Sequence, residues 1–229
     1  MYKHILLDLD DTILDFNASE TFAFQKVAED LGVTYSETLL DHYKIYNQSL
    51  WQKIEKNELT KAELMTQRFP GFFSQYGIHN LIGQEIDDLF RDYLATGAHV
   101  VPGAQQLLID LKKAGKQVYA ASNGIYTTQI SRLEQANLIE YFDELFISEK
   151  LGYNKPHAGF FEQVFKQLEP ASFDSSIMVG DSLSSDIKGA NAVKLPVVWF
   201  NPNNISAPKD LTIDYQISDL THLYDILDL

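Results

Sequence analysis

Three polar residues stand at alternate positions near the start of the chain: Asp8, Asp10 and Thr12, within the run Ile-Leu-Leu-Asp-Leu-Asp-Asp-Thr at positions 5–12. Because side chains alternate along a strand, all three are expected to point the same way where a buried strand ends. Two converging carboxylates repel each other and need a proton, a lysine or a divalent cation beside them. The pattern suits phosphate-ester chemistry, in which one carboxylate attacks phosphorus and a second transfers a proton. Solvated turns and helix N-caps carry similar acidic runs, so other motifs must decide.

A second polar group, Ser122-Asn123-Gly124, follows an apolar strand and precedes a helix expected from near Thr127. A hydroxyl and free backbone N–H groups at a helix start can bind phosphate, although Ser-Asn-Gly is also a frequent turn. Lys155, before Pro156 in a polar loop, is either an ordinary exposed charge or the cation for this site. Its ammonium would stabilise a phosphoryl oxygen and an attacking carboxylate together.

A third acidic group, Gly180-Asp181 with Asp186 five residues on, follows the apolar strand at 176–179. Asp181 is predicted to join Asp8 and Asp10 as oxygen ligands of a hard cation. Mg²⁺ is favoured because it accepts few carboxylates together with waters and substrate phosphate. Both aspartates could instead cap the next helix, and Asp186 is assigned a supporting place behind the ligands.

The elements that must position these residues alternate between strand and helix from Gly103 onward, which predicts a parallel sheet covered by helices on both faces. In such sheets, ligands bind beyond the carboxyl ends of the strands, where the strand order reverses. The predicted strands are 5–8, 117–121, 145–147, 176–179, 197–200 and a weaker one at 215–217.

A helical insertion separates the first strand from its partners, because the pattern after Asp15 changes to a helical period. Helices are expected over 17–31, after Ser36 to Ile54, after the Thr60 capping box, and over 81–94. We therefore predict an α/β core domain of residues 1–15 and 98–229, with a helical domain of residues 16–97.

Composition excludes several classes of function. The net charge of −14 argues against a nucleic-acid binder, and the chain has no cysteine for disulfides or thiolate chemistry. Neither a signal peptide nor a long apolar stretch appears, so the expected location is the cytoplasm, with no membrane partner. The expected partner is a small phosphate ester, bound by a monomer or weak homodimer.

Taken together and in this order, the four motifs resemble those of the haloacid dehalogenase (HAD) superfamily over nearly the whole chain. The resemblance implies a Rossmann-like core with a type 1 helical cap. It implies that Asp8 is a nucleophile forming an aspartyl-phosphate, and that Asp10 is the general acid and base. The remaining roles implied are phosphate binding by Thr12, Ser122, Asn123 and Lys155, and metal binding by Asp8, Asp10 and Asp181, supported by Asp186. An acid at Asp10 favours a phosphatase over the dehalogenase branch, whose leaving halide needs no proton.

Longer segments are similar to the pyrimidine 5′-nucleotidase subgroup, which implies nucleoside monophosphate substrates. These segments are 122–126 with Gln129, 148–156 and 199–202. A sugar-phosphate or phosphoglycolate-type phosphatase, a phosphomutase, and less readily a silent binding protein on the same fold remain the alternatives. Aromatic residues of the insertion could stack on a base, but at helical spacing they more often form a core. They are Phe16, Phe22, Tyr43, Tyr46 and Trp51.

Overall fold

The computed structural model describes residues 2–97, 99–168 and 170–229 and divides the chain into two compact units. The core unit comprises Met1–Asp15 and His99–Leu229, and the inserted unit comprises Phe16–Ala98. The boundary predicted at residue 98 falls on a residue outside the described ranges. The chain leaves and re-enters the core unit through paired backbone. The Asp15 N–H donates to the His99 carbonyl at 3.0 Å, and Leu14 pairs with Val100 in an antiparallel bridge.

The core unit is built on a six-stranded sheet in the order β3-β2-β1-β4-β5-β6, in which all neighbours pair in parallel. The sheet confirms the predicted α/β fold class and all six predicted strands. The apolar runs of the four inner strands are buried almost throughout, as expected for parallel strands covered on both faces, whereas the two edge strands are partly exposed. The strands are β1 His4–Leu7, β2 Gln117–Ser122, β3 Glu144–Ile147, β4 Ser176–Gly180, β5 Val197–Phe200 and β6 Tyr215–Ile217.

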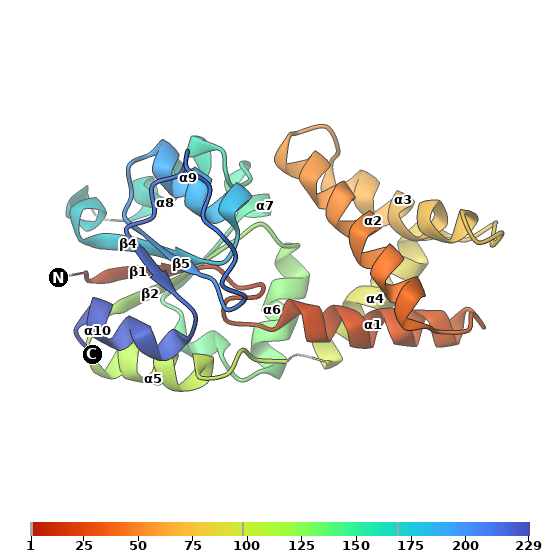
Figure 1. Cartoon of the computed structure of the whole chain (residues 1–229), viewed down its shortest axis with the longest axis horizontal. Coiled ribbons are helices and arrows are strands. Elements are labelled where there is room, and N and C mark those ends of the chain that lie inside the picture. Colours follow the sequence, from red (N-terminus) through yellow and green to blue (C-terminus); the bar gives the residue numbers. More distant parts are fainter. Residues whose placement is uncertain (1, 98, 169) are drawn as a thin grey trace. The chain divides into compact units, whose positions relative to one another are not determined.

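Helices cover both faces of this sheet (Figure 1). Alternate strand residues explain the two layers, because Leu7 packs with Leu107 and Leu223 on one face, whereas Leu6 packs with Phe160 and Ile187 on the other. The first face carries α5 Ala104–Lys113, α6 Tyr126–Gln135 and α10 Leu223–Leu227. The second carries α8 Ala158–Gln167 and α9 Lys188–Ala192, and the short α7 Ser148–Leu151 follows β3.

The inserted unit consists of four helices around a core of its own. Ser36 caps the second helix, and Thr60 forms the predicted capping box with Glu63. Tyr43 is fully buried and stacks on Phe24 at 4.3 Å between ring centroids, so this predicted aromatic belongs to the core. The helices are α1 Phe16–Asp30, α2 Glu37–Glu55, α3 Lys61–Ser74 and α4 Gly83–Thr96. Among the described residues, no helix combines the length and apolar character needed to cross a membrane.

Candidate active site

The site lies at the carboxyl ends of three adjacent strands, β2, β1 and β4. Leu7 pairs with Ala120 on one side and with Val179 on the other, and the Asp8 N–H donates to the Val179 carbonyl at 2.9 Å. The chain order reverses here, because β2 lies on one side of β1 and β4 on the other. This is where open parallel sheets bind ligands.

Lys155 joins two of the strand-end motifs. Only 1% of its side chain is exposed, and its Nζ donates to Asp8 Oδ1 and to Asp186 Oδ1, each at 2.6 Å, and to the Ala121 carbonyl. All three ammonium hydrogens are therefore used. Burial alone lowers the pKa of Lys155, but the carboxylates of Asp186 and Asp8 outweigh it, so the pKa lies above its usual value. The lysine is charged at every physiological pH.

Asn123 holds the loop that carries this lysine. Its Nδ2 donates to the Lys155 carbonyl, and the Lys155 N–H donates to its Oδ1, both at 2.8 Å. This pair of hydrogen bonds resembles the pair that two neighbouring strands exchange, and it fixes the backbone of Lys155. The Asn123 side chain is thus engaged in placing Lys155.

Three carboxylates, that of Asp8 among them, converge at the strand ends. One oxygen each from Asp8, Asp181 and Asp186 lies within 4.8 Å of the others. Asp186 sits in a π-helical turn, Leu183–Ile187, and its Oδ2 accepts from the Ser182 N–H at 3.1 Å. Gly180 permits this approach, because a Cβ there would lie 2.3 Å from Asp186 Oδ2.

The charges of this cluster fit a divalent cation. Burial raises the pKa of Asp8 well above its usual value, and Asp186 raises it further against the opposing effect of Lys155. Burial likewise raises the pKa of Asp181, with contributions from Asp186 and Asp8. A hard cation with oxygen ligands removes this repulsion, and few carboxylates with room for water and phosphate suit Mg²⁺.

The Asp10 carboxylate is not a member of the cluster found among the described residues. Its Oδ2 accepts from Gln129 Nε2 at 2.7 Å and its Oδ1 accepts from Arg132 Nη1, while 31% of its side chain remains exposed. The expectation that Asp8, Asp10 and Thr12 share one direction assumed a strand through position 12. In the structure β1 ends at Leu7, and the chain then turns, with Asp11 at a φ of 58°. Asp186, not Asp10, supplies the third converging carboxylate.

The two remaining predicted residues differ in their surroundings. Ser122 ends β2, and its Oγ accepts from the Gly124 N–H at 3.0 Å and from Gln129 Nε2 at 2.8 Å. Thr12 is completely buried, and its hydroxyl has no hydrogen-bond partner within the part of the chain that the structure describes.

Sequence reasoning missed Arg132 and noted Gln129 only within a longer segment. Both are almost completely buried on α6, three residues apart and next to Leu133, which packs in the core. Polar side chains on the buried face of an amphipathic helix need partners, and that signal was present in the sequence.

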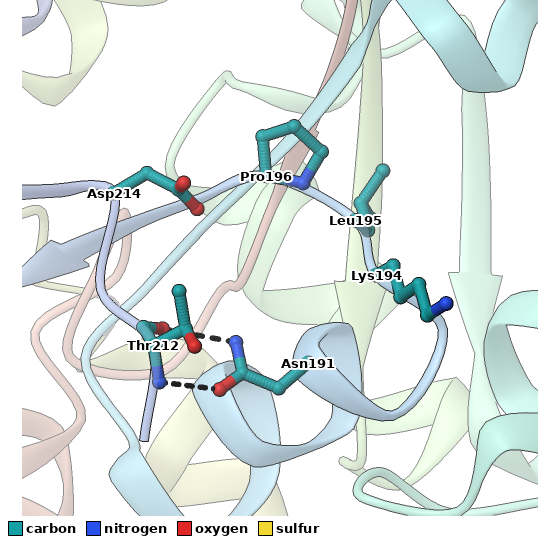
Figure 2. Close-up of a pocket in the computed structure, with 6 residues that line it drawn as sticks. All are labelled: Asn191, Lys194, Leu195, Pro196, Thr212 and Asp214. Atoms are coloured by element: carbon teal, nitrogen blue, oxygen red, sulfur yellow. Dashed lines mark hydrogen bonds between the residues drawn. The ribbon is translucent and has the colours of Figure 1, made fainter. Parts of the chain in front are cut away.

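A shallow pocket at the opposite edge of the sheet carries none of the predicted site residues (Figure 2). It lies where β5 and β6 begin. Asn191 exchanges two hydrogen bonds with the Thr212 backbone, and Asp214 accepts from the Val197 N–H at 2.9 Å. These polar groups are occupied by structural bonds. The lining residues are Asn191, Lys194, Leu195, Pro196, Thr212 and Asp214.

Comparison with known proteins agrees with this geometry. The sequence model of the family described as haloacid dehalogenase-like hydrolase matches residues 2–194. The chain is 35% identical to pyrimidine 5′-nucleotidase PynA of Streptococcus pneumoniae, covering 99% of this chain and 95% of that protein. It is 34% identical to a glyceraldehyde 3-phosphate phosphatase of Pyrococcus furiosus, covering 99% and 93%. The crystal structure of the HAD-hydrolase YfnB of Bacillus subtilis bound to magnesium superposes with a TM-score of 0.91 at 32% identity, covering 100% and 99%.

Proposed function

This chain belongs to the haloacid dehalogenase-like hydrolases and is a phosphoric monoester hydrolase, and we propose that it hydrolyses nucleoside 5′-monophosphates, pyrimidine ones best, with Mg²⁺. The observation that carries the proposal is the buried Lys155 ammonium held between Asp8 and Asp186 at the strand ends, with Asp181 beside them. Such a lysine neutralises an attacking carboxylate and the phosphoryl oxygens that approach it.

We assign the first chemical step to Asp8 and Asp10. A carboxylate oxygen of Asp8 bonds to phosphorus while the bond from phosphorus to the substrate's 5′-oxygen breaks, and Asp10 gives that oxygen a proton. In the second step, Asp10 removes a proton from water. The water oxygen bonds to phosphorus, and Asp8 leaves as a carboxylate. The second step thus returns Asp8 to its free carboxylate and Asp10 to its protonated form.

The phosphate is assigned to Lys155 and Ser122, with the Asn123 segment holding the lysine loop. Thr12 retains the phosphate role implied by the family resemblance, although its burial makes it the weakest member of the set. Asp8, Asp181 and Asp186 would hold Mg²⁺ through carboxylate oxygens or waters bound to them. Asp10 keeps the ligand role that the family resemblance implies, although its carboxylate is paired with Arg132. When bound, the ion supplies positive charge that offsets the charge developing on the phosphoryl oxygens.

The substrate class rests on the relatives and on the inserted unit. The similarity to PynA supports pyrimidine nucleotides, and the longer segments at 122–126, 148–156 and 199–202 support the same subgroup. The core motifs handle phosphate and metal, so discrimination between leaving groups is assigned to the inserted unit, Phe16–Ala98, acting as the cap. The expected preference for pyrimidines over purines is assigned to the same unit.

A triose- or sugar-phosphate phosphatase is the second candidate, because the Pyrococcus furiosus relative shares 34% identity with this chain, against 35% for PynA. A panel separates the two: kcat/KM for UMP, dUMP and dTMP, for purine monophosphates, for glyceraldehyde 3-phosphate and for a hexose phosphate, at one fixed Mg²⁺ concentration. Asp8→Asn protein, purified in parallel, controls for contaminating phosphatases. Pyrimidine monophosphates should give the highest values. A tenfold advantage for glyceraldehyde 3-phosphate or the hexose phosphate would replace the nucleotidase assignment with the second candidate.

A further inference from the structure

Both amide hydrogens and the amide oxygen of Gln129 make hydrogen bonds inside the site. One hydrogen of Nε2 goes to Asp10 Oδ2 at 2.7 Å and the other to Ser122 Oγ at 2.8 Å. Its Oε1 accepts from Arg132 Nη1 at 3.0 Å. Arg132 has only donors, so it fixes which end of the amide faces it and which end faces Asp10 and Ser122.

This arrangement determines what the Ser122 hydroxyl can do. A hydroxyl accepts two hydrogen bonds and donates one. Ser122 Oγ already accepts from the Gly124 N–H at 3.0 Å and from Gln129 Nε2. Its one hydrogen finds no acceptor within residues 2–97, 99–168 and 170–229, so it is available for an oxygen of a bound phosphate.

The same amide restrains Asp10. Bonds from Gln129 and Arg132 reach the two carboxylate oxygens separately, which fixes the rotation of the carboxylate as well as its position. Gln129 and Arg132 are each 1% exposed, whereas Asp10 is at the surface of the site. A rigid, buried support beneath a solvent-facing proton-transfer group is what a positioned acid requires.

Gly124 is shaped around this amide. A Cβ at position 124 would lie 2.5 Å from Gln129 Nε2 and 2.7 Å from its Cδ and Cγ. Any side chain there must push the amide away from its partners. Gly124 therefore leaves room for the Gln129 amide, in addition to its place in the turn.

We propose that Gln129, oriented by Arg132, is a positioning residue that links the two halves of the reaction. It aims the Asp10 carboxylate at the leaving oxygen and sets Ser122 as a hydrogen-bond donor to phosphate. The inference rests on the proposed function, because it requires Asp10 to protonate a leaving group.

The test is the dependence on the leaving group in Gln129→Met, which keeps the length of the side chain and removes both donors. A nucleoside 5′-monophosphate leaves as an alkoxide and needs the proton, whereas p-nitrophenyl phosphate leaves as a stable phenolate. We expect kcat to fall about tenfold for dUMP, a part of the usual contribution of a positioned acid, and less than about threefold for p-nitrophenyl phosphate. Inhibition by inorganic phosphate should weaken severalfold, because Ser122 loses its orientation.

Gln135→Met is the matched control, since Gln135 is exposed at the end of the same helix. It should leave both rates and phosphate inhibition unchanged. Equal falls for the two substrates in Gln129→Met, or unchanged dUMP turnover, would overturn the inference while leaving the phosphatase assignment intact. Wild-type protein that hydrolyses neither ester would refute the proposed function itself, and this inference with it.

A second test uses Gly124→Ala and does not depend on how well methionine packs. Alone, it should reproduce the selective loss on dUMP by displacing the amide. In a Gln129→Ala background the amide is gone, so the added methyl should change kcat less than twofold. Independent, multiplying effects of the two substitutions would show that Gly124 acts through something other than Gln129, and would contradict the proposed linkage.

Discussion

Replacing Lys155 by Met should destabilise the core unit strongly, because it leaves two buried carboxylates without their cation. The Lys155 ammonium contacts Asp8 and Asp186 at 2.6 Å each, and Asp186 is fully buried. Removing one partner of a buried ion pair costs about 3–5 kcal/mol. For a unit of this size each kcal/mol corresponds to about 2–4 °C in Tm, which gives a fall of about 6–20 °C.

The loss should depend on pH in a direction that follows from the carboxylates. Burial and mutual repulsion already raise the pKa of Asp8 above its unfolded value, and removal of Lys155 removes an opposing effect. A carboxyl group whose pKa is raised in the folded state binds a proton more tightly there, so stability falls as the pH rises from the unfolded pKa through the folded one. The variant should therefore lose less stability at pH 5 than at pH 8.

Thermal unfolding monitored by circular dichroism in the presence of chelator measures the effect at both pH values. Lys155→Met combined with Asp186→Asn should recover part of the lost Tm, since one of the two unpaired charges is removed. Lys113→Met is the control, because the Lys113 side chain is 70% exposed. A fall below about 2 °C at pH 8, or a double variant less stable than Lys155→Met alone, would refute the charge argument.

Four further outcomes are expected. Mg²⁺ should raise the Tm of the wild-type protein more at pH 8 than at pH 5. The pKa values of Asp8 and Asp181 are raised, so these groups ionise as the pH rises, and the ion relieves the repulsion between the ionised carboxylates. Equal Tm shifts at the two pH values would contradict this. Asp181→Ala should weaken Mg²⁺ binding at least about tenfold in titration calorimetry, and an unchanged affinity would remove Asp181 from the ligand set. Asp8→Asn should abolish turnover, with a Tm in chelator that is unchanged or higher, and steady hydrolysis by this variant would show that Asp8 is not the nucleophile. Asp10→Asn should slow turnover by roughly 10² to 10⁴, and a rate within a few-fold of wild type would show that Asp10 is not the general acid and base.

The sequence predicted the strands and the polar residues at their ends because both depend on a short stretch of neighbouring residues. A short apolar run indicates a buried strand, and the polar residues that follow it indicate where the strand leaves the core. Asp8, Ser122 and Asp181 all stand at such points. The rule that parallel sheets expose their carboxyl ends at one edge then brings them together without knowledge of the strand order.

The direction of Asp10 was not readable in the same way. The period of two applies only while the strand continues, and β1 ends at Leu7, before the chain turns. The partner of Asp10 is Arg132, 122 residues away along the chain, so the pair is set by the docking of α6 on the sheet. Asp186 entered the carboxylate cluster for a comparable reason, because a π-helical turn and the missing side chain of Gly180 bring it inward.

The paired backbone at Asp15 and His99 bears on how such enzymes diversify. The inserted unit begins and ends at neighbouring points of the core, where the Asp15 N–H donates to the His99 carbonyl at 3.0 Å beside the Leu14–Val100 bridge. An exchange of everything between those points leaves the residues of the flanking strand and its carboxylates unchanged, much as lengthening a hairpin leaves its stem unchanged. Evolution, or a protein engineer, can therefore replace the whole segment as a cassette and acquire a new preference while inheriting the chemistry intact. A short turn in place of the cassette would leave a bare core whose two ends already lie within hydrogen-bonding distance.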